Sequence, residues 1–292
     1  MDKSLLETKL NNVVFAIFDT ETTGDNSRRE DKPIEVAVVL WNLEMGFIDK
    51  PWSKLVDPKM PIHPSAIAVH GLTDDEVEGQ PILEEILPEF HDYIKNTVLV
   101  AHNIAFDLNM LPTLKEKPNP KIDSLRFARH IYRIGDLGYK NQDLTSHKSQ
   151  ELRYWLNVKI DTMGLQAHRA AADILVTGEV FKETLLRFMD MTYSETLGEL
   201  IDFINAPIIS EKMPFGKYKG MNLKQSIEKE LKNPKNYFAW LLKSVNNGDM
   251  VIDEDLKYSI EYNLKSLGVN PVALLAEENY KKWQDFAKKI KP

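Results

Sequence analysis

The chain has 292 residues, a formal net charge of −7 and no cysteine. The acidic balance excludes a uniformly basic protein that binds polyanions by charge alone. The absence of cysteine excludes disulfides, thiolate nucleophiles and cysteine-based zinc sites, so any metal must be held by oxygen or imidazole. No segment approaches the ~18 consecutive apolar residues of a membrane span. We therefore expect no membrane partner and a reduced, cytoplasmic location.

Apolar runs and helical spacing alternate over the first 190 residues. Nearly unbroken apolar runs indicate strands, and apolar residues three or four apart indicate helices. The predicted strands are 13–18, 34–41, 52–56 and 98–101. The predicted helices are 82–94, 106–114, 124–132, 149–156 and 168–191. This alternation predicts an α/β domain at 1–190.

The composition changes near residue 206. Residues 191–206 are predicted to form a helical connector. Residues 206–245 contain eight lysines and three glutamates, a local charge of +5, with aromatic residues between them. We therefore predict a smaller second domain at 207–292, closed by a helix at 272–290.

Two acidic residues follow the first predicted strand. Asp19 and Glu21 are two residues apart, so their side chains share a face in extended chain. Two carboxylates on one face repel each other unless a cation lies between them, and Mg²⁺ prefers such oxygen ligands. The end of a central strand is also where open α/β sheets bind ligands. The alternative is a solvated turn, because Asp, Thr and Gly are common turn formers.

A second acidic position follows the strand predicted at 98–101. Asp107 lies in the first turn of a predicted helix, where an acid commonly complements the helix dipole. That explanation does not account for His102 and Asn103, which cluster at the same strand end. The dipole explanation therefore covers Asp107 alone and leaves the polar cluster at this strand end unexplained.

The third candidate pair is His168 and Asp173. Five residues within a helix place two side chains about 140° apart. Both can face one site only if His168 lies at or just before the first turn, which Gly164 permits. The alanines at 170–172 allow close packing against a sheet. The alternative is a capping histidine with a solvated aspartate.

Together these positions supply four carboxylates and one histidine. That set suits two-metal phosphoryl chemistry, in which two Mg²⁺ roughly 3.5–4 Å apart hold the attacking and leaving oxygens. A histidine with a pKa near neutrality can deprotonate the attacking water.

The three motifs resemble those of the DEDD exonuclease superfamily, in its histidine-containing subclass. The matching segments are Asp-Thr-Glu-Thr-Thr-Gly at 19–24, Ala-His-Asn-Ile-Ala-Phe-Asp at 101–107 and the five-residue step at 168–173. Residues 64–73 resemble a family segment that lies over the nucleotide. The resemblance covers about residues 12–190. The superfamily includes the proofreading subunit of bacterial DNA polymerase III. The resemblance implies a ribonuclease H-like mixed sheet flanked by helices, and 3′→5′ hydrolysis to nucleoside 5′-monophosphates.

The resemblance also assigns roles to single residues. It implies two Mg²⁺, with Mn²⁺ as a substitute, and His168 as the general base. The implied metal ligands are Asp19, Glu21, Asp107 and Asp173. The implied contacts to the terminal nucleotide are Thr20, Thr22, Thr23, His70, Asn103 and Phe106.

The second region resembles the small C-terminal module of exodeoxyribonuclease X-like proteins. The resemblance rests on residues 213–220 and 237–242. A basic, aromatic, exposed loop near glycines can contact phosphate and stack on a base. The candidates for such contact are Lys217, Tyr218 and Lys219. We expect Phe238 and Trp240 to form the core of a small domain.

The leading hypothesis is a metal-dependent 3′→5′ exonuclease acting on DNA, with single-stranded 3′ ends favoured and RNA as a further substrate. An RNA- or oligonucleotide-directed enzyme is the alternative, because the motifs contact phosphate and metal and do not decide recognition of a 2′-OH. A non-catalytic adaptor is a third hypothesis. Loss of a metal ligand would be its signature, and none is lost.

Overall fold

The computed structural model describes residues 3–24, 30–161, 168–233 and 236–271. The chain forms two compact units, unit 1 (Met1–Asn205) and unit 2 (Ala206–Pro292). The helix predicted at 272–290 lies outside the described residues, and so does Gly164.

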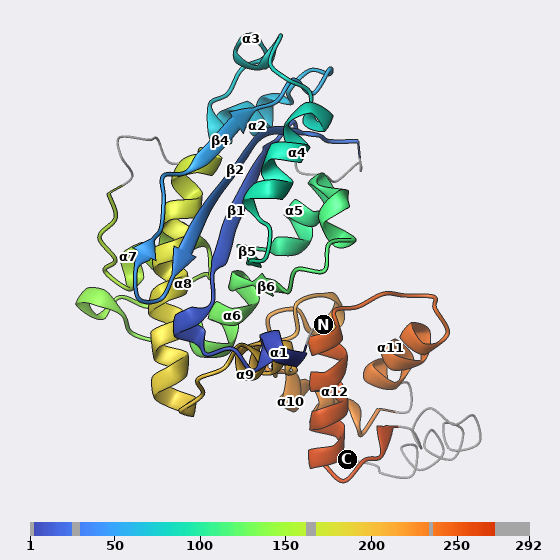
Figure 1. Ribbon diagram of the computed structural model, residues 1–292. Helices are drawn as coiled ribbons and strands as arrows, with labels where there is room; N and C mark the ends of the chain where they lie inside the picture. Colours follow the sequence, from blue (N-terminus) through green and yellow to red (C-terminus); the bar gives the residue numbers. More distant parts are fainter. Residues whose placement is uncertain (1–2, 25–29, 162–167, 234–235, 272–292) are drawn as a thin grey trace. The chain divides into compact units, whose positions relative to one another are not determined.

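Unit 1 is built around a six-stranded mixed sheet (Figure 1). The strand order is β3-β2-β1-β5-β6, with β4 also paired to β2. Strand β2 runs antiparallel to β1, whereas β5 is parallel to β1 and β6 is parallel to β5. The strands are β1 (Phe15–Thr22), β2 (Pro33–Asn42), β3 (Gly46–Phe47), β4 (Trp52–Leu55), β5 (Val98–Ala101) and β6 (Lys121–Asp123).

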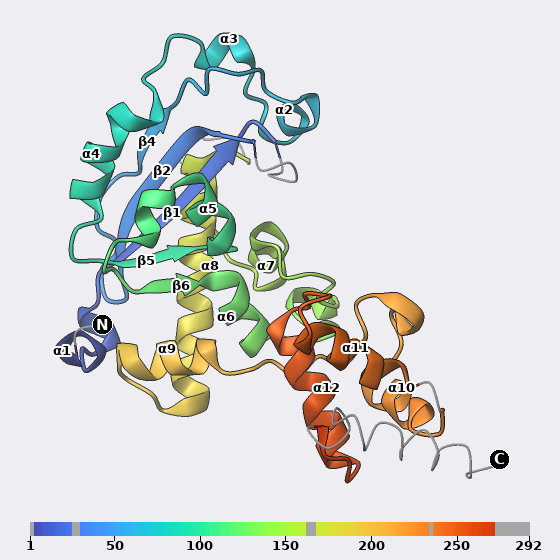
Figure 2. The same ribbon diagram turned by 90° about the vertical axis from the view of Figure 1, so that its right-hand side faces the viewer.

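Helices cover both faces of the sheet, and the predicted α/β fold with a mixed sheet is confirmed. Helix α8 (Ala170–Thr192) lies along one face, and α4 (Leu83–Tyr93) and α5 (Ile104–Met110) lie on the other (Figures 1 and 2). The remaining α-helices are α1 (Lys3–Leu6), α2 (Pro64–His70), α3 (Asp74–Val77), α6 (Ser124–Ile131), α7 (Ser149–Trp155) and α9 (Leu197–Asn205). Short 3₁₀ turns are η1 (Leu10–Asn12), η2 (Pro112–Lys115) and η3 (Tyr139–Asn141).

The unbroken apolar run in β1 is explained by burial on both faces. Phe15 and Ile17 pack into the cluster formed with α8, which includes Phe181. Ala16 and Phe18 belong to the opposite cluster, formed with α4. A strand covered on both sides needs apolar residues at successive positions rather than at alternate ones. This packing fixes β1 at the centre of unit 1.

Strand β1 is longer than predicted. It continues through Thr22 instead of ending at residue 18, because β2 pairs with it as far as Pro33. The first acidic motif therefore lies within a strand, and the turn alternative for Asp19 and Glu21 is wrong. Strands β3 and β6 were missed, since two or three residues are too short for a periodic pattern.

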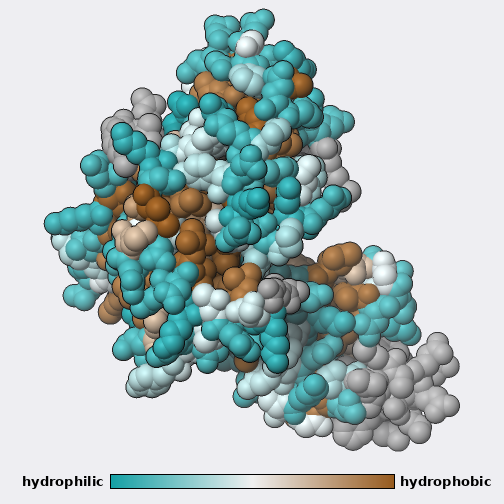
Figure 3. All heavy atoms as spheres, in the orientation of Figure 1, coloured by the Kyte–Doolittle hydropathy of each residue, from teal (hydrophilic) through white to brown (hydrophobic). Residues whose placement is uncertain are grey.

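Hydrophilic side chains cover most of the face of unit 1 seen in Figure 3. Hydrophobic side chains gather in the middle of this face, where β2 and α8 overlap in Figure 1. Among the described residues, no helix combines the length and the apolar character needed to cross a membrane.

Unit 2 is helical in its described part. It contains η4 (Gly216–Tyr218), α10 (Leu223–Glu230), α11 (Tyr237–Asn246) and α12 (Glu254–Ser266). Phe238 is buried in its core, as expected. Trp240 is 47% exposed, so the prediction that it belongs to the core is wrong. The two residues lie about 200° apart on α11, and the core faces only one side of that helix.

Candidate active site

The carboxyl end of β1 carries the first two acidic side chains. Strand β5 pairs with β1 only at Phe15, Ala16 and Ile17. The residues after Ile17 therefore extend past β5, and Thr20 among them is hydrogen-bonded to Asp107 of α5. Asp19 and Glu21 alternate with buried threonines and are themselves partly exposed.

Helix α8 brings a third carboxylate to this strand. One oxygen from each of Asp19, Glu21 and Asp173 can be chosen so that all three lie within 4.8 Å of one another. Asp173 lies in the first turn of α8. Three carboxylate oxygens gathered in this way are the hard ligands that Mg²⁺ and Mn²⁺ accept. The donor set therefore fits a divalent cation.

Asp107 approaches the same strand from α5. It is buried, and its Oδ1 accepts a hydrogen bond from Thr20 Oγ1 at 2.9 Å. The negative charge of Asp107 helps to raise the pKa of Asp19. All four predicted carboxylates are thus electrostatically linked at one end of β1.

The pKa values show the cost of gathering these acids without a cation. Burial, followed by the charge of Asp107, raises the pKa of Asp19 well above its usual range. Burial and the charge of Asp173 raise the pKa of Glu21 to about 8. Burial also raises the pKa of Asp173, and it raises that of Asp107 to about 7 against the hydrogen bond from Thr20. Positive charge is needed to keep all four ionised at neutral pH.

His168 lies just before α8, as the spacing argument required. Arg169 is the N-cap of the helix, and His168 has a left-handed backbone (φ +61°). Its Nδ1 is 4.0 Å from Asp173 Oδ2, and its side chain is 53% exposed. An imidazole beside the carboxylate cluster and open to solvent can exchange a proton with water there.

A buried glutamate anchors this helix start and was missed in the sequence. Glu35 lies opposite Glu21 in the β1–β2 register. Its Oε2 accepts hydrogen bonds from Arg169 Nε at 3.0 Å and from the backbone N–H of Ala170 at 3.2 Å. Ser53 donates to its other oxygen at 2.8 Å. Glu35 therefore connects strand β2 to Arg169 and Ala170 at the start of α8, which lie between His168 and Asp173 in the sequence.

Gln150 was missed as well. It lies on α7 and donates from Nε2 to Asp173 Oδ1 at 2.8 Å. This bond orients the carboxylate and opposes the rise in the Asp173 pKa that burial causes. A buried acid within an apolar strand could have drawn attention to Glu35, whereas Gln150 carries no comparable sign in the sequence.

The threonines predicted to contact the nucleotide are engaged in local bonds. The Thr22 hydroxyl donates to the carbonyl of Gly24, and Thr23 Oγ1 donates to Asp31 Oδ1 at 3.1 Å. The backbone N–H of Lys32 donates to Thr23 Oγ1 at 3.0 Å. Thr23 thus holds Asp31 and Lys32, the residues just before β2, against the end of β1.

The remaining predicted contacts lie in different settings. His70 is buried at the end of α2, with Nε2 3.3 Å from the carbonyl oxygen of Thr22. Asn103 is exposed and caps α5 in a left-handed conformation, and Phe106 is partly buried. His102 is turned toward other partners, because its ring nitrogens face Ser124 Oγ at 3.0 Å and the carbonyl oxygen of His147 at 2.8 Å.

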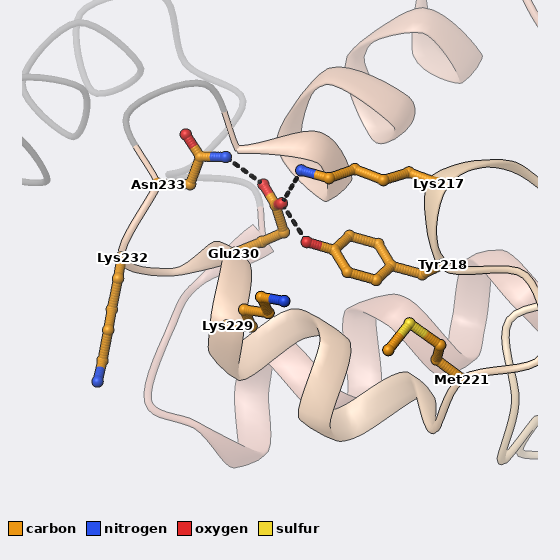
Figure 4. Close-up of a pocket in the computed structure, with 7 residues that line it drawn as sticks. All are labelled: Lys217, Tyr218, Met221, Lys229, Glu230, Lys232 and Asn233. Carbon is orange, nitrogen blue, oxygen red and sulfur yellow. Dashed lines mark hydrogen bonds and ion pairs between the residues drawn. The ribbon is translucent and has the colours of Figure 1, made fainter.

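The predicted contact residues of unit 2 are not all exposed. Tyr218 is only 3% exposed, so its predicted exposure is wrong. Its hydroxyl donates to the buried carboxylate of Glu230, to which Lys217 Nζ also donates at 2.6 Å (Figure 4). Lys219 is exposed. Packing against Phe238 takes the tyrosine ring into the core of unit 2, where it cannot stack on a base.

Comparison with known proteins relates unit 1 to a family of exonucleases. The RNase T family model, described as an exonuclease, matches residues 16–181, more than half of the chain. The chain is 33% identical over 193 residues to a PolC-type DNA polymerase III of Clostridium perfringens, a stretch that covers 63% of this chain and 12% of that protein. It is 29% identical over 248 residues to exodeoxyribonuclease 10 of Escherichia coli, which covers 85% of this chain and 99% of that protein.

A solved structure of exonuclease X in complex with 5′-overhanging duplex DNA is similar as well. It matches with a TM-score of 0.52 and 26% identity, over 65% of this chain and 99% of that one. The expected ribonuclease H-like fold is thereby confirmed. The chain spans only 11–12% of the length of the PolC-type relatives that it matches.

Proposed function

The chain belongs to the RNase T family of exonucleases, and on this basis we propose that it is a metal-dependent 3′→5′ exonuclease that hydrolyses DNA and releases nucleoside 5′-monophosphates. The observation that carries the proposal is the convergence of Asp19, Glu21 and Asp173 within 4.8 Å, with His168 beside them. No simple structural role explains three carboxylates held so close together, because their charges destabilise the folded chain.

Four carboxylates are assigned to metal binding. Asp19, Glu21, Asp107 and Asp173 would hold two Mg²⁺ or Mn²⁺ ions. When bound, such ions neutralise charge on the phosphate and lower the pKa of water. Asp19 and Glu21 belong to β1, Asp107 to α5 and Asp173 to α8, so the site draws its ligands from three elements. Thr20 and Gln150 would orient Asp107 and Asp173 through the hydrogen bonds described above.

His168 is assigned as the general base. Its imidazole takes a proton from the attacking water, and the carboxylate of Asp173 then stabilises the imidazolium that forms. The 4.0 Å separation and the half-exposed ring support this role. Burial lowers the pKa of His70, which keeps that imidazole neutral, and we assign it to contact with the sugar of the terminal nucleotide.

DNA is the proposed substrate because of two relatives that the match covers to 99% of their own chains. One is named an exodeoxyribonuclease, and the other was solved with duplex DNA bearing a 5′ overhang. We propose that single-stranded 3′ ends are favoured. We further assign residues 1–190 to the exonuclease domain, 191–206 to a connector and 207–292 to a separate module.

End-specific labelling tests this function. A single-stranded DNA carrying a label on its 3′-terminal nucleotide is digested beside one labelled at the 5′ end, with Mg²⁺ or with EDTA. We expect early release of labelled mononucleotide from the 3′-labelled strand, with Mg²⁺ only. Matched RNA strands reveal whether ribose ends are cut more readily. Absence of release with Mg²⁺ and Mn²⁺, or release first from the 5′ end, would contradict the proposal.

A further inference from the structure

Unit 2 contains a pocket at the carboxyl end of α10 that the proposed catalytic residues do not use. It has a volume of about 600 Å³ and is lined by three lysines, a buried glutamate, Tyr218 and Met221, among others (Figure 4). Such a volume lies in the range of ligand-binding sites. We propose that this pocket holds the phosphodiester backbone of the substrate strand. The inference rests on the proposed function, since it assigns a second contact to the same nucleic acid.

The floor of the pocket is a closed hydrogen-bond network. The carboxylate of Glu230 accepts hydrogen bonds from Lys217 Nζ at 2.6 Å, from the Tyr218 hydroxyl and from Asn233 Nδ2 at 3.1 Å. The backbone N–H of Tyr237 donates to it at 2.8 Å. Figure 4 shows the three side chains converging on Glu230. The floor is therefore preformed and needs no ligand to complete it.

This network changes the role expected for Lys217. Burial alone would raise the pKa of Glu230, but the hydrogen bonds from Lys217 and Tyr218 outweigh it and lower the pKa. The glutamate is therefore ionised, and it neutralises the charge of Lys217. Lys217 and Tyr218 shape the pocket, and they leave the attraction of an anion to other residues.

Those residues are Lys229 and Lys232. Neither has an ion-pair or hydrogen-bond partner for its ammonium group within the part of the chain that the structure describes. Three lysines against one glutamate leave the pocket with a net charge of +2. Two uncompensated ammonium groups on residues that line a pocket with a neutral, preformed floor favour an anionic ligand, and Figure 4 shows Lys232 directed away from that floor.

The form of the pocket favours a strand over a small anion. Its volume far exceeds that of one phosphate, and Met221, which is 51% exposed, adds an apolar surface for a sugar or a base. Lysine is a point charge that contacts phosphate without reading sequence. An exonuclease must accept any sequence as it moves along its substrate, so sequence-independent contact suits this ligand.

Salt dependence of binding tests the inference. The full chain and its Lys229→Gln/Lys232→Gln variant are titrated into a fluorescein-labelled oligothymidine of roughly 20 nucleotides in EDTA, and anisotropy is read between about 50 and about 200 mM KCl. Each lysine that no longer pairs with a phosphate reduces the slope of log K against log salt by roughly 0.7 on single strands. We expect weaker binding and a slope smaller by about 1.4 in the double variant.

The matched control is Lys257→Gln/Lys265→Gln, which removes the same charge from α12 of the same unit. It should keep the parent affinity and slope. Equal slopes and affinities for the parent and the Lys229→Gln/Lys232→Gln variant would overturn the inference. The inference would also be overturned if an acidic peptide of the same charge bound the double variant more weakly than the parent, while the oligonucleotide bound both equally. Release of labelled nucleotide by the parent with Mg²⁺ reports on the catalytic proposal separately, because the binding titration in EDTA involves no hydrolysis.

Discussion

At Glu21, the chemistry of the site opposes the stability of the fold. Its pKa is about 8 in the folded chain and near 4.5 in the unfolded one, so the folded chain binds this proton more tightly. The stability gained from the proton is complete below about pH 4.5 and is lost as the pH rises through about 8. We expect Glu21→Gln to raise the free energy of unfolding at pH 8, without metal, by on the order of 1 kcal/mol.

Urea unfolding in EDTA across this pH range measures that effect. Glu84→Gln, an exposed glutamate in the first turn of α4, is the matched control and should follow the parent. If the parent and Glu21→Gln lose stability equally between about pH 4.5 and about pH 8, the pKa of Glu21 is not raised in the folded chain.

The same shifts set a proton balance for metal binding. With a pKa of about 8, Glu21 is largely protonated at pH 7, and a divalent cation requires the carboxylate form. We expect Mg²⁺ binding at pH 7 to release protons to the buffer. Calorimetric titrations in two buffers of different ionisation enthalpy would show different apparent heats. Identical heats would contradict the assignment of these acids as ligands.

Glu35 is a positioning residue. It touches the start of α8 through Arg169 and Ala170, and His168 and Asp173 lie on either side of these residues. We expect Glu35→Gln to lower kcat by roughly 10–100-fold, as the loss of supporting bonds to catalytic groups commonly does. KM should change little, because the glutamate lies away from solvent. Steady-state kinetics beside Glu84→Gln measure both; a variant with parental kcat, or with a raised KM alone, would contradict this role.

At the scale of elements, the pairing of β1 with β2 decides where the chemistry lies. The apolar run of β1 and the Ala-rich start of α8 were both predictable, because each has a regular pattern. The continuation of β1 through its acidic residues could not be predicted, because polar residues after an apolar run usually mark a turn. Pairing across to Pro33 overrides that local preference. The spacing of Asp19 and Glu21 made them candidates beside the turn alternative, and the position of Glu35 within an apolar strand offered a weaker sign. Gln150 becomes visible only through its contact with Asp173, which is distant in sequence.

Helix α8 packs closely against the sheet at Gly178. A Cβ placed there would lie 2.7 Å from the ring of Phe47 and 3.0 Å from Ile17 Cδ1. We expect Gly178→Val to destabilise unit 1 by roughly 1–3 kcal/mol through overpacking. Thermal or urea unfolding measures this loss. Leu186→Val, at an exposed position on the same helix, controls for the helix propensity of valine. Unchanged stability would show that the helix can shift away from the sheet without cost.

At the scale of the whole molecule, charge is unevenly distributed. Residues 206–245 carry +5, and since the chain as a whole carries −7, the other residues carry −12. Four of those negative charges belong to the proposed metal ligands. An acidic chain can therefore engage a polyanion if cations are bound at the carboxylates and if lysines act locally in unit 2. Composition alone excluded charge-driven binding of nucleic acid over the whole surface, and it remained compatible with local binding of this kind.

The most direct measurement is the rate of nucleotide release from a 3′-labelled single strand by the parent, Asp19→Asn and Asp92→Asn. Asp19 lies within the carboxylate cluster, whereas Asp92 is an exposed acid on α4. With Mg²⁺ present, we expect Asp19→Asn to lose at least ~10²-fold in rate and Asp92→Asn to match the parent. A folded Asp19→Asn variant that releases 3′ nucleotides at the parental rate would show that the carboxylate cluster on β1 is not the catalytic site.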